Sequence, residues 1–235
     1  YSIKYRRFAF NIIKNKVYNV VLAGYIKHFL VNELHTDPTR VLVFPHPMTQ
    51  LENRIVTDID CVGISNSNDE NIIEEIINSE ISRELIKKNN LKVLLKSRNH
   101  RYDNGYLKII SGFIDSDLYD DYIARAKCIL IPFPETFRFR VSGTLIDALS
   151  NNKSVIGTNI HVITQASNSY KNVIKIFNIS SFVNDIIEVG KNSSLMEQDF
   201  SNFQKDHGED ILSEILNNAI ERGIKNQPME DIYDF

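Results

Sequence analysis

The sequence predicts an α/β fold built on a doubly wound parallel sheet, and three observations support this. Short continuous apolar runs recur along the chain, as in strands that are buried on both faces. Amphipathic segments with helical spacing separate most of these runs. With 235 residues, of which 43% are hydrophobic and 24% charged, the chain has enough apolar side chains for a sizeable core. The pattern is typical of a Rossmann-like sheet with helices on both faces.

The first segment contains two strand candidates with a helix between them, at residues 17–22, 24–34 and 41–44. Pro45 and Pro47 then interrupt regular structure, and a polar run follows. We therefore expect residues 1–50 to be the end of one domain and residues 51–57 to be a linker.

A second domain is expected over residues 58–206, followed by a C-terminal helix and tail at 207–235. Its strand candidates are 60–64, 92–96, 107–110, 128–131, 154–157 and 173–177. Its helix candidates are 71–88, 117–126, 142–150 and 180–189. A polar loop replaces the helix between the second and third of these strands. Ligands of such sheets bind in the loops beyond the carboxyl ends of the strands.

The segment 128–159 carries the strongest functional signal. An apolar strand is followed by a basic and aromatic loop, and Ser142 is a good N-cap for the next helix. Gly143 lets a ligand approach the backbone closely, and Thr144 follows it in the first helical turn. Free N–H groups at this helix end, with Arg140 just upstream, suit an anion such as a diphosphate.

Asp147 lies three to four residues beyond Gly143 and Thr144. Helical side chains lean toward the helix N-terminus, so this carboxylate can reach ribose hydroxyls of a ligand bound there. The alternative is a surface carboxylate that only favours the positive end of the helix.

Residues after two other strands are further candidates. Lys96 and Arg98 would neutralise phosphate charge at the same edge of the sheet, or else be solvated charges at a strand end. Gly112 and Phe113 would offer backbone groups to the edge of a nucleotide base, although glycine after a strand is common.

Glu135 lies in the loop before Ser142 and would pair with a sugar hydroxyl or with a developing positive charge. The alternative is a salt bridge with Arg138 or Arg140. The chain has no Walker loop, no Gly-x-Gly-x-x-Gly and no His-Glu-x-x-His, which disfavours P-loop NTPases, dinucleotide dehydrogenases and zinc hydrolases. We expect no metal site and no permanently bound cofactor.

Charge and cysteine content limit the partners. A net charge of -3 argues against nucleic acid as a partner. Cys61 and Cys128 lie in apolar runs and are expected to be reduced core residues of a cytoplasmic protein. In the segment 1–16, basic residues are interleaved with apolar ones, which indicates either peripheral contact with a membrane or an interdomain helix.

Three runs together resemble the donor-binding half of GT-B-fold glycosyltransferases of the bacterial surface-polysaccharide type. They are DDYIARA at 120–126, IPF at 131–133 and RVSGTLIDAL at 140–149, with VIGT at 155–158 beside them. The resemblance covers residues 61–182 well. It implies the C-terminal domain of a GT-B fold with a remnant of the N-terminal domain, and a nucleotide diphosphate sugar as donor substrate, usually without a bound metal.

By this resemblance Ser142, Gly143 and Thr144 would hold the diphosphate, and Asp147 would take the ribose. The charge would be balanced by Arg140 together with Lys96 or Arg98. Our catalytic candidates are Glu135 and Arg140, and the candidates for binding the donor are Ser142, Gly143, Thr144, Asp147, Lys96, Arg98, Gly112 and Phe113.

Two departures from the family matter. Many retaining members have two Glu residues eight positions apart, but the residue eight after Glu135 is Gly143, so the role of Glu135 and the stereochemical outcome stay open. The chain is also short for two complete domains and begins at Tyr1 rather than Met, so we expect a fragment whose acceptor site lies mostly elsewhere.

The expected function is glycosyl transfer in capsule, exopolysaccharide or lipopolysaccharide synthesis, in the cytoplasm or at the inner face of the membrane. The acceptor would be a saccharide or a lipid-linked saccharide. The alternatives are a sugar-nucleotide epimerase of similar architecture and a non-catalytic α/β nucleotide-binding module.

Overall fold

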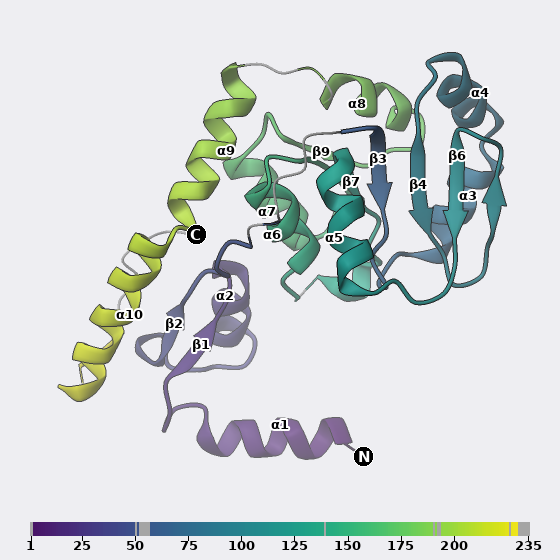
Figure 1. Cartoon of the computed structure of the whole chain (residues 1–235). Coiled ribbons are helices and arrows are strands. Elements are labelled where there is room, and N and C mark those ends of the chain that lie inside the picture. Colours follow the sequence, from purple (N-terminus) through teal and green to yellow (C-terminus); the bar gives the residue numbers. More distant parts are fainter. Residues whose placement is uncertain are drawn as a thin grey trace. The chain divides into compact units, whose positions relative to one another are not determined.

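The computed structural model describes residues 2–49, 51, 57–138, 140–189, 191, 194–225 and 227–229, with side chains described from residue 8 onward. The chain forms two compact units (Figure 1). The first consists of Tyr1–Pro47, Phe139–Val141 and Lys205–Phe235, and the second of Met48–Arg138 and Ser142–Gln204. The domain boundaries expected at 50 and 206 stay predictions.

The second unit is built on a seven-stranded sheet in the order β5-β6-β4-β3-β7-β8-β9. Six strands run parallel, and the short edge strand β5 runs antiparallel to β6. The strands are β3 (Ile59–Gly63), β4 (Val93–Lys96), β5 (Tyr102–Asp103), β6 (Leu107–Ile110), β7 (Ala126–Ile131), β8 (Ser154–Gly157) and β9 (Ile174–Ile176). The predicted doubly wound parallel sheet is confirmed.

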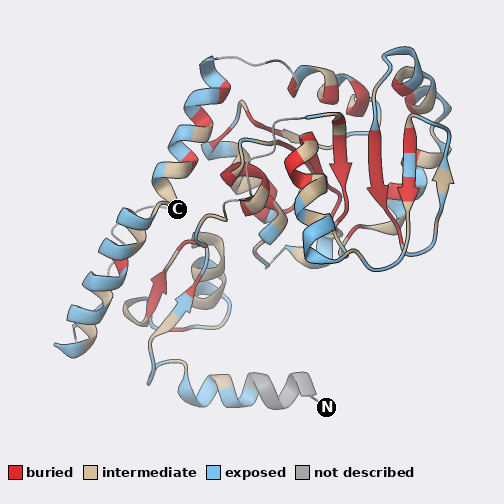
Figure 2. Ribbon diagram, viewed as in Figure 1, coloured by how far each residue is buried: buried red, intermediate tan, exposed pale blue. Residues whose placement is uncertain are grey.

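Helices cover both faces of this sheet. One face packs against α3 (Glu70–Asn78), α4 (Glu80–Lys88) and α8 (Phe182–Val189), through a core that includes Leu95 and Leu130. The other face carries α5 (Ser116–Arg125), α6 (Gly143–Ser150) and α7 (His161–Ser169). Every residue of β4 is buried (Figure 2), and so is every residue of β7 except Lys127. Because side chains alternate along a strand, both faces of the sheet are covered at these strands.

The two cysteines lie side by side in this sheet, where Cys61 of β3 is in register with Cys128 of β7. Both are free and buried. The pKa of the Cys128 thiol is raised, mainly by a hydrogen bond with Cys61 and also by burial. The expectation of reduced core cysteines therefore agrees with their positions.

The order of the strands reverses direction at β3. The chain proceeds outward through β4 and β6 on one side, and through β7, β8 and β9 on the other. The loops after β3 and β7 consequently leave toward opposite faces, which is the arrangement that opens a ligand crevice beyond the carboxyl ends of the two strands.

The first unit contains a two-stranded parallel sheet of β1 (Asn19–Val21) and β2 (Val41–Val43), connected by α2 (Gly24–Asn32) and a short 3-10 turn, Pro38–Arg40. Val21 and Val43 pack against α2. Leu42 faces the other way and packs against Ile215 of α10 (Glu209–Ile224). Helix α1 (Ser2–Ile13) precedes β1. None of the described helices has both the length and the apolar character that crossing a bilayer requires.

Several elements differ from the sequence-based expectation. The helix expected at 71–88 is divided at Ser79, which ends α3 and caps α4 through its side chain. Helices α7 and α9 (Ser194–Asp206) and strand β5 were not expected. The buried face of α9 contains a carboxylate, Asp199, which accepts hydrogen bonds from the amide and side chain of Asn172 at 2.7 and 3.1 Å.

Candidate functional site

The candidate site lies in the second unit, beyond the carboxyl ends of the parallel strands. The loops after β3 and β7 are joined there by a hydrogen bond of 2.6 Å from the amide of Asp69 to the carbonyl oxygen of Pro132. The side chain of Asp69 then caps α3, accepting from the amide of Asn71 at 3.0 Å. These contacts fix the loops on both sides of the point where the strand order reverses.

The first two residues of α6 have amide N–H groups that are available to a ligand. Ser142 is its N-cap, as predicted, and its Oγ accepts from the amide of Leu145 at 3.1 Å. Within the described residues, the amide N–H groups of Gly143 and Thr144 have no hydrogen-bond partner. A Cβ added to Gly143 would meet no atom within 4 Å. The end of this helix can therefore receive an anion without displacing a protein group.

Three hydroxyl groups and one carboxylate form a chain beside this helix end. The hydroxyl of Tyr119, on α5, lies 3.2 Å from Thr144 Oγ1 and 3.1 Å from Asp147 Oδ2. Asp147 Oδ1 accepts from the hydroxyl of Thr49 at 2.6 Å. The carboxylate predicted to bind ribose is thus held from two sides by hydroxyl donors.

Lys96 is a buried cation at the carboxyl end of β4, with only 5% of its surface exposed. Leu95 belongs to the core on one face, so Lys96, the next residue of the strand, points to the face that carries α6. Its Nζ donates to Oδ1 of Asn66, and burial lowers its pKa. Within the described residues no carboxylate is paired with this ammonium group, which makes it a source of positive charge for a ligand.

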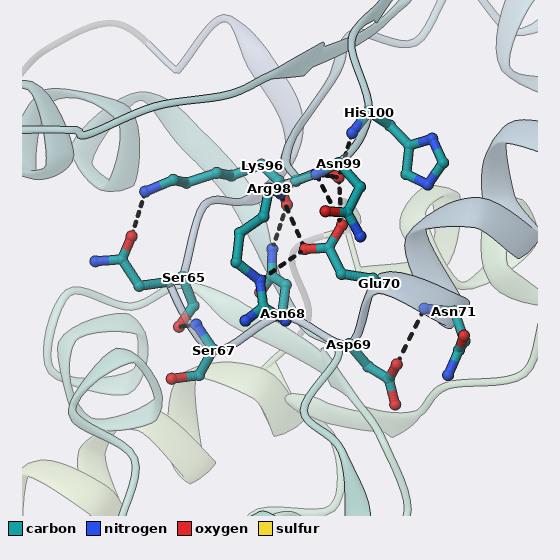
Figure 3. A network of polar contacts seen from close by, with 12 residues as sticks. Ser65, Ser67, Asn68, Asp69, Glu70, Asn71, Lys96, Arg98, Asn99 and His100 are labelled. Atoms are coloured by element: carbon teal, nitrogen blue, oxygen red, sulfur yellow. Dashed lines mark hydrogen bonds and ion pairs between the residues drawn. The ribbon is translucent and has the colours of Figure 1, made fainter.

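Arg98 and its neighbours are held by the carboxylate of Glu70, the first residue of α3 (Figure 3). This carboxylate accepts from the amides of Arg98 and Asn99 at 2.9 and 3.3 Å, from Arg98 Nε at 3.3 Å, and from the hydroxyl of Ser97. Burial alone would raise the pKa of Glu70, but these hydrogen bonds together lower it. The loop after β4 is therefore already occupied by an internal anion.

Asn68 ties the ends of β3 and β4 together. Its Nδ2 donates to the carbonyl oxygen of Gly63 at 2.8 Å and to that of Lys96 at 2.9 Å, and Figure 3 shows the second contact. Its Oδ1 is buried and has no hydrogen-bond partner among the described residues. The N-cap of the helix that follows is Asp69, so Asn68 acts between the two strands and not as a helix cap.

Gly112 and Phe113 follow β6. Gly112 has a φ of 100°, a conformation that favours glycine, and a Cβ there would meet no atom within 4 Å. The side chain of Phe113 is 87% exposed. An aromatic ring this exposed offers a flat apolar face at the same edge of the sheet as α6.

The two catalytic candidates lie in different units. Glu135 begins a short 3-10 turn, Glu135–Phe137, is 69% exposed, and pairs with Arg138 at 3.7 Å, which is one of the two alternatives expected for it. Arg140 belongs to the first unit, where its carbonyl oxygen accepts from the hydroxyl of Tyr25 at 2.7 Å. Burial raises the pKa of Tyr25 to about 12. The roles of Glu135 and Arg140 stay predictions.

The structure therefore places every predicted site residue of the second unit at or after the carboxyl end of a parallel strand. It also adds residues that sequence reasoning missed, namely Thr49, Tyr119, Asn66 and Glu70. Only Glu70 carried a signal, because an acidic residue in the first turn of a helix is a common anchor for backbone amides. Among the described residues no group of three or more His, Cys, Asp or Glu side chains is arranged to hold a metal ion.

A cavity of about 600 Å³ lies elsewhere in the second unit, near the amino ends of β7 and β8. Its lining includes Lys127, Lys153 and Glu197. Lys127 is paired with Asp60 at 2.7 Å, and Lys153 donates to the carbonyl oxygen of Ala124 at 2.7 Å. Both lysine ammonium groups therefore already have partners within the protein. The cavity lies where the strands begin, whereas the N-terminus of α6 lies beyond the ends of the strands.

Comparison with solved structures gives several matches to glycosyltransferases. A mutant of S. aureus TarM in complex with Fondaparinux, alpha-GlcNAc-glycerol and UDP is 15% identical, with a TM-score of 0.63 over 92% of this chain and 46% of TarM. Pneumococcal O-GlcNAc transferase GtfA, in complex with UDP and GlcNAc, is 10% identical, with a TM-score of 0.62 over 90% of this chain and 47% of GtfA. WaaG, a glycosyltransferase involved in lipopolysaccharide biosynthesis, is 14% identical, with a TM-score of 0.53 over 85% of this chain and 61% of WaaG.

No family model and no curated protein matches the chain. The similarity to the solved structures shows that the chain has the fold of GT-B glycosyltransferases, and the fold expected from the resemblance is confirmed. The chain spans about half the length of TarM and GtfA.

Proposed function

We propose that the chain is the donor-binding part of a glycosyltransferase that moves a sugar from a nucleotide diphosphate sugar to an acceptor hydroxyl. The observation that carries the proposal is the open end of α6, where Gly143 and Thr144 present two amide N–H groups, without partners among the described residues, beyond the carboxyl end of β7. A helix N-terminus in this position is suited to a diphosphate because the amides and the helix dipole both favour negative charge.

The same groups would promote the reaction. When the bond between the sugar and the diphosphate breaks, negative charge builds on the departing diphosphate. The amides of α6 and the ammonium group of Lys96 are held in place before reaction, so they stabilise that charge without reorganisation. Arg98 and Arg140 are proposed as further cations. The donor is a substrate, and we propose neither a permanently bound cofactor nor a metal ion.

The solved structures favour a uridine nucleotide and a polysaccharide product. TarM and GtfA were solved with UDP, and WaaG is involved in lipopolysaccharide biosynthesis. We therefore propose a role in capsule, exopolysaccharide or lipopolysaccharide synthesis, with a saccharide or a lipid-linked saccharide as acceptor, in the cytoplasm or at the inner face of the membrane.

The test is a calorimetric titration of the 235-residue chain with UDP and with GDP. The discriminating variant is Gly143→Glu, because a Cβ at this position would meet no atom within 4 Å. A carboxylate in the first helical turn favours the helix but repels a diphosphate, so nucleotide affinity should fall by about a hundredfold or more while the folded state is retained. Gly143→Gln, which has nearly the same size but no charge, is the matched control and should bind more tightly than Gly143→Glu.

Two results would contradict the proposal. The first is failure of the wild-type chain to bind either nucleotide at millimolar concentration, which would favour a non-catalytic module with another ligand. The second is equal affinity of Gly143→Glu and wild type, which would remove the diphosphate from the end of α6. An epimerase is distinguished by its product, since it converts one nucleotide sugar into another without releasing the nucleoside diphosphate.

A further inference from the structure

Tyr119 and Thr49 contact the carboxylate of Asp147 from two different segments. Tyr119 lies on α5 and Thr49 lies at the beginning of the second unit, 98 residues from Asp147 in the sequence. The segment around Thr49 is anchored along α6, because the Thr49 amide donates to Ser150 Oγ at 3.3 Å and Asn151 Nδ2 donates to the Thr49 carbonyl at 3.0 Å. The Thr49 hydroxyl is therefore held at a fixed position beside α6.

The protons in this group can be assigned from its chemistry. A phenol has one proton, and burial, together with the neighbouring Asp147, keeps the pKa of Tyr119 above its ordinary value, so the phenol remains a donor. The carboxylate of Asp147 accepts only, so it receives the protons of Tyr119 and Thr49. The hydroxyl of Thr144 then donates its own proton to the oxygen of Tyr119.

This assignment has two consequences. The Thr144 hydroxyl is directed at Tyr119, so Thr144 has only its amide to offer a diphosphate. Among the described residues, one hydrogen bond reaches each oxygen of Asp147, and a carboxylate oxygen can accept about two. One acceptor position remains on each oxygen, which matches two neighbouring hydroxyl groups of a ligand.

We infer that Tyr119 and Thr49 are positioning residues that hold Asp147 as the acceptor for the two ribose hydroxyls of the donor nucleotide. The inference rests on the proposed function, because the nucleotide must first be bound at α6. The two protein donors restrain the carboxylate through both of its oxygens before the ligand arrives. Pre-organisation of this kind increases affinity by reducing the ordering that binding requires.

The experiment compares UDP with 2′,3′-dideoxy-UDP, or the two guanosine counterparts where the wild type binds GDP instead. Both probes carry the same base and diphosphate, but only the first carries the ribose hydroxyls. Tyr119→Phe and Thr49→Val each remove one donor to Asp147 and should each weaken UDP binding by about five- to tenfold. The affinity for the dideoxy nucleotide should change by less than about twofold, because it makes no hydrogen bond with Asp147.

The controls separate positioning from a merely structural role. Thr49→Ser keeps the hydroxyl and should restore the wild-type preference for UDP, and Tyr122→Phe removes another hydroxyl from α5 and should not alter it. Thermal unfolding of each variant shows that it is folded. Equal loss of affinity for both nucleotides, or no loss for either, overturns the inference while the proposed function stands. A wild-type chain that binds no nucleotide overturns both.

Discussion

The carboxylate of Glu70 accepts a hydrogen bond of 2.9 Å from the amide of Arg98, which joins the first turn of α3 to the loop after β4. The amide of Asn99 and the hydroxyl of Ser97 donate to the same carboxylate. An internal anion therefore fills the concave backbone of this loop, as a phosphate would. The ammonium group of Lys96, which is paired with no carboxylate among the described residues, therefore adds positive charge at this strand end that Glu70 does not neutralise.

Replacing Glu70 by Gln should destabilise the second unit by about 1–2 kcal/mol at pH 7, because the loop amides lose a charged acceptor. Since the pKa of Glu70 is lowered from its ordinary value of 4.5, its contribution to stability is complete above pH 4.5 and is lost as the pH falls through the lower, folded-state value. Urea unfolding of both proteins from pH 7 downward measures this difference.

The expected result is a difference in unfolding free energy that is constant from pH 7 to about 5 and shrinks at lower pH. Glu74→Gln, an exposed position on the same helix, is the control and should change stability by less than about 0.5 kcal/mol. A difference between wild type and Glu70→Gln that does not depend on pH would show that the ionised carboxylate is not the group that holds the loop.

Replacing Lys96 by Met should separate ligand binding from stability. The variant keeps the apolar stem but removes a buried charge whose described partner is a neutral amide, so the free energy of unfolding at pH 7 should stay the same or rise. Affinity for UDP should fall by about tenfold or more, because a charge-assisted contact to phosphate is lost, while affinity for uridine should not change.

The pH dependence of this variant has the opposite direction to that of Glu70→Gln. Burial lowers the pKa of Lys96 below its ordinary value of 10.5, so the cost of burying the ammonium group disappears as the pH rises from the folded-state value to the ordinary one. Any stability advantage of Lys96→Met should therefore shrink toward pH 10.5. Lys92→Met removes an equal charge from an exposed position before the same strand, and it should leave UDP affinity unchanged.

Replacing Phe113 by Ala tests whether the loop after β6 contacts a base. The ring is exposed, so its removal should alter the free energy of unfolding by less than about 0.5 kcal/mol. If the ring stacks on the base of the donor, affinity for UDP should fall by about tenfold. Ile81→Ala, at an exposed position on α4, is the matched control, and equal affinities of all three proteins would exclude a contact with the base.

The sequence was sufficient for the parts of the fold that depend on local pattern. Ser142 caps α6 as expected, because the preference of serine for an N-cap is a property of a few neighbouring residues. The division of one expected helix at Ser79 was missed, because the apolar spacing continues across it and the serine that stops α3 also starts α4. Helix α9 was missed because the carboxylate of Asp199 lies on its buried face, between Met196 and Phe203, and interrupts the apolar pattern.

The candidate site was predictable as a place but not as a set of contacts. In a helix, side chains lean toward the N-terminus, so the sequence alone predicts that the carboxylate of Asp147 is directed toward the N-terminus of α6. The donors that hold it come from Thr49 and Tyr119, which are distant in the sequence. Their positions depend on how the sheet orders its strands, and no local pattern contains that information. The same is true of Glu70, whose partners follow a different strand.

Replacing Gly157 by Ala should destabilise the second unit through one identifiable contact. Gly157 ends β8, and a Cβ there would lie 2.9 Å from two side-chain carbons of Ile163 on α7, closer than real contacts allow. Because the neighbouring atoms must move, the expected loss is about 1–3 kcal/mol in the free energy of unfolding. Ile163→Ala alone should cost about 2–4 kcal/mol because it leaves a cavity.

The double variant is the decisive measurement. The methyl group that Gly157→Ala adds fills part of the space that Ile163→Ala vacates, so the combined loss should be smaller than the sum of the single losses by about 1 kcal/mol or more. Gly143→Ala adds the same methyl group where it meets no atom, and this control should not lower stability. Additive losses in the double variant would mean that the close contact between Gly157 of β8 and Ile163 of α7 does not cause the loss of stability in Gly157→Ala.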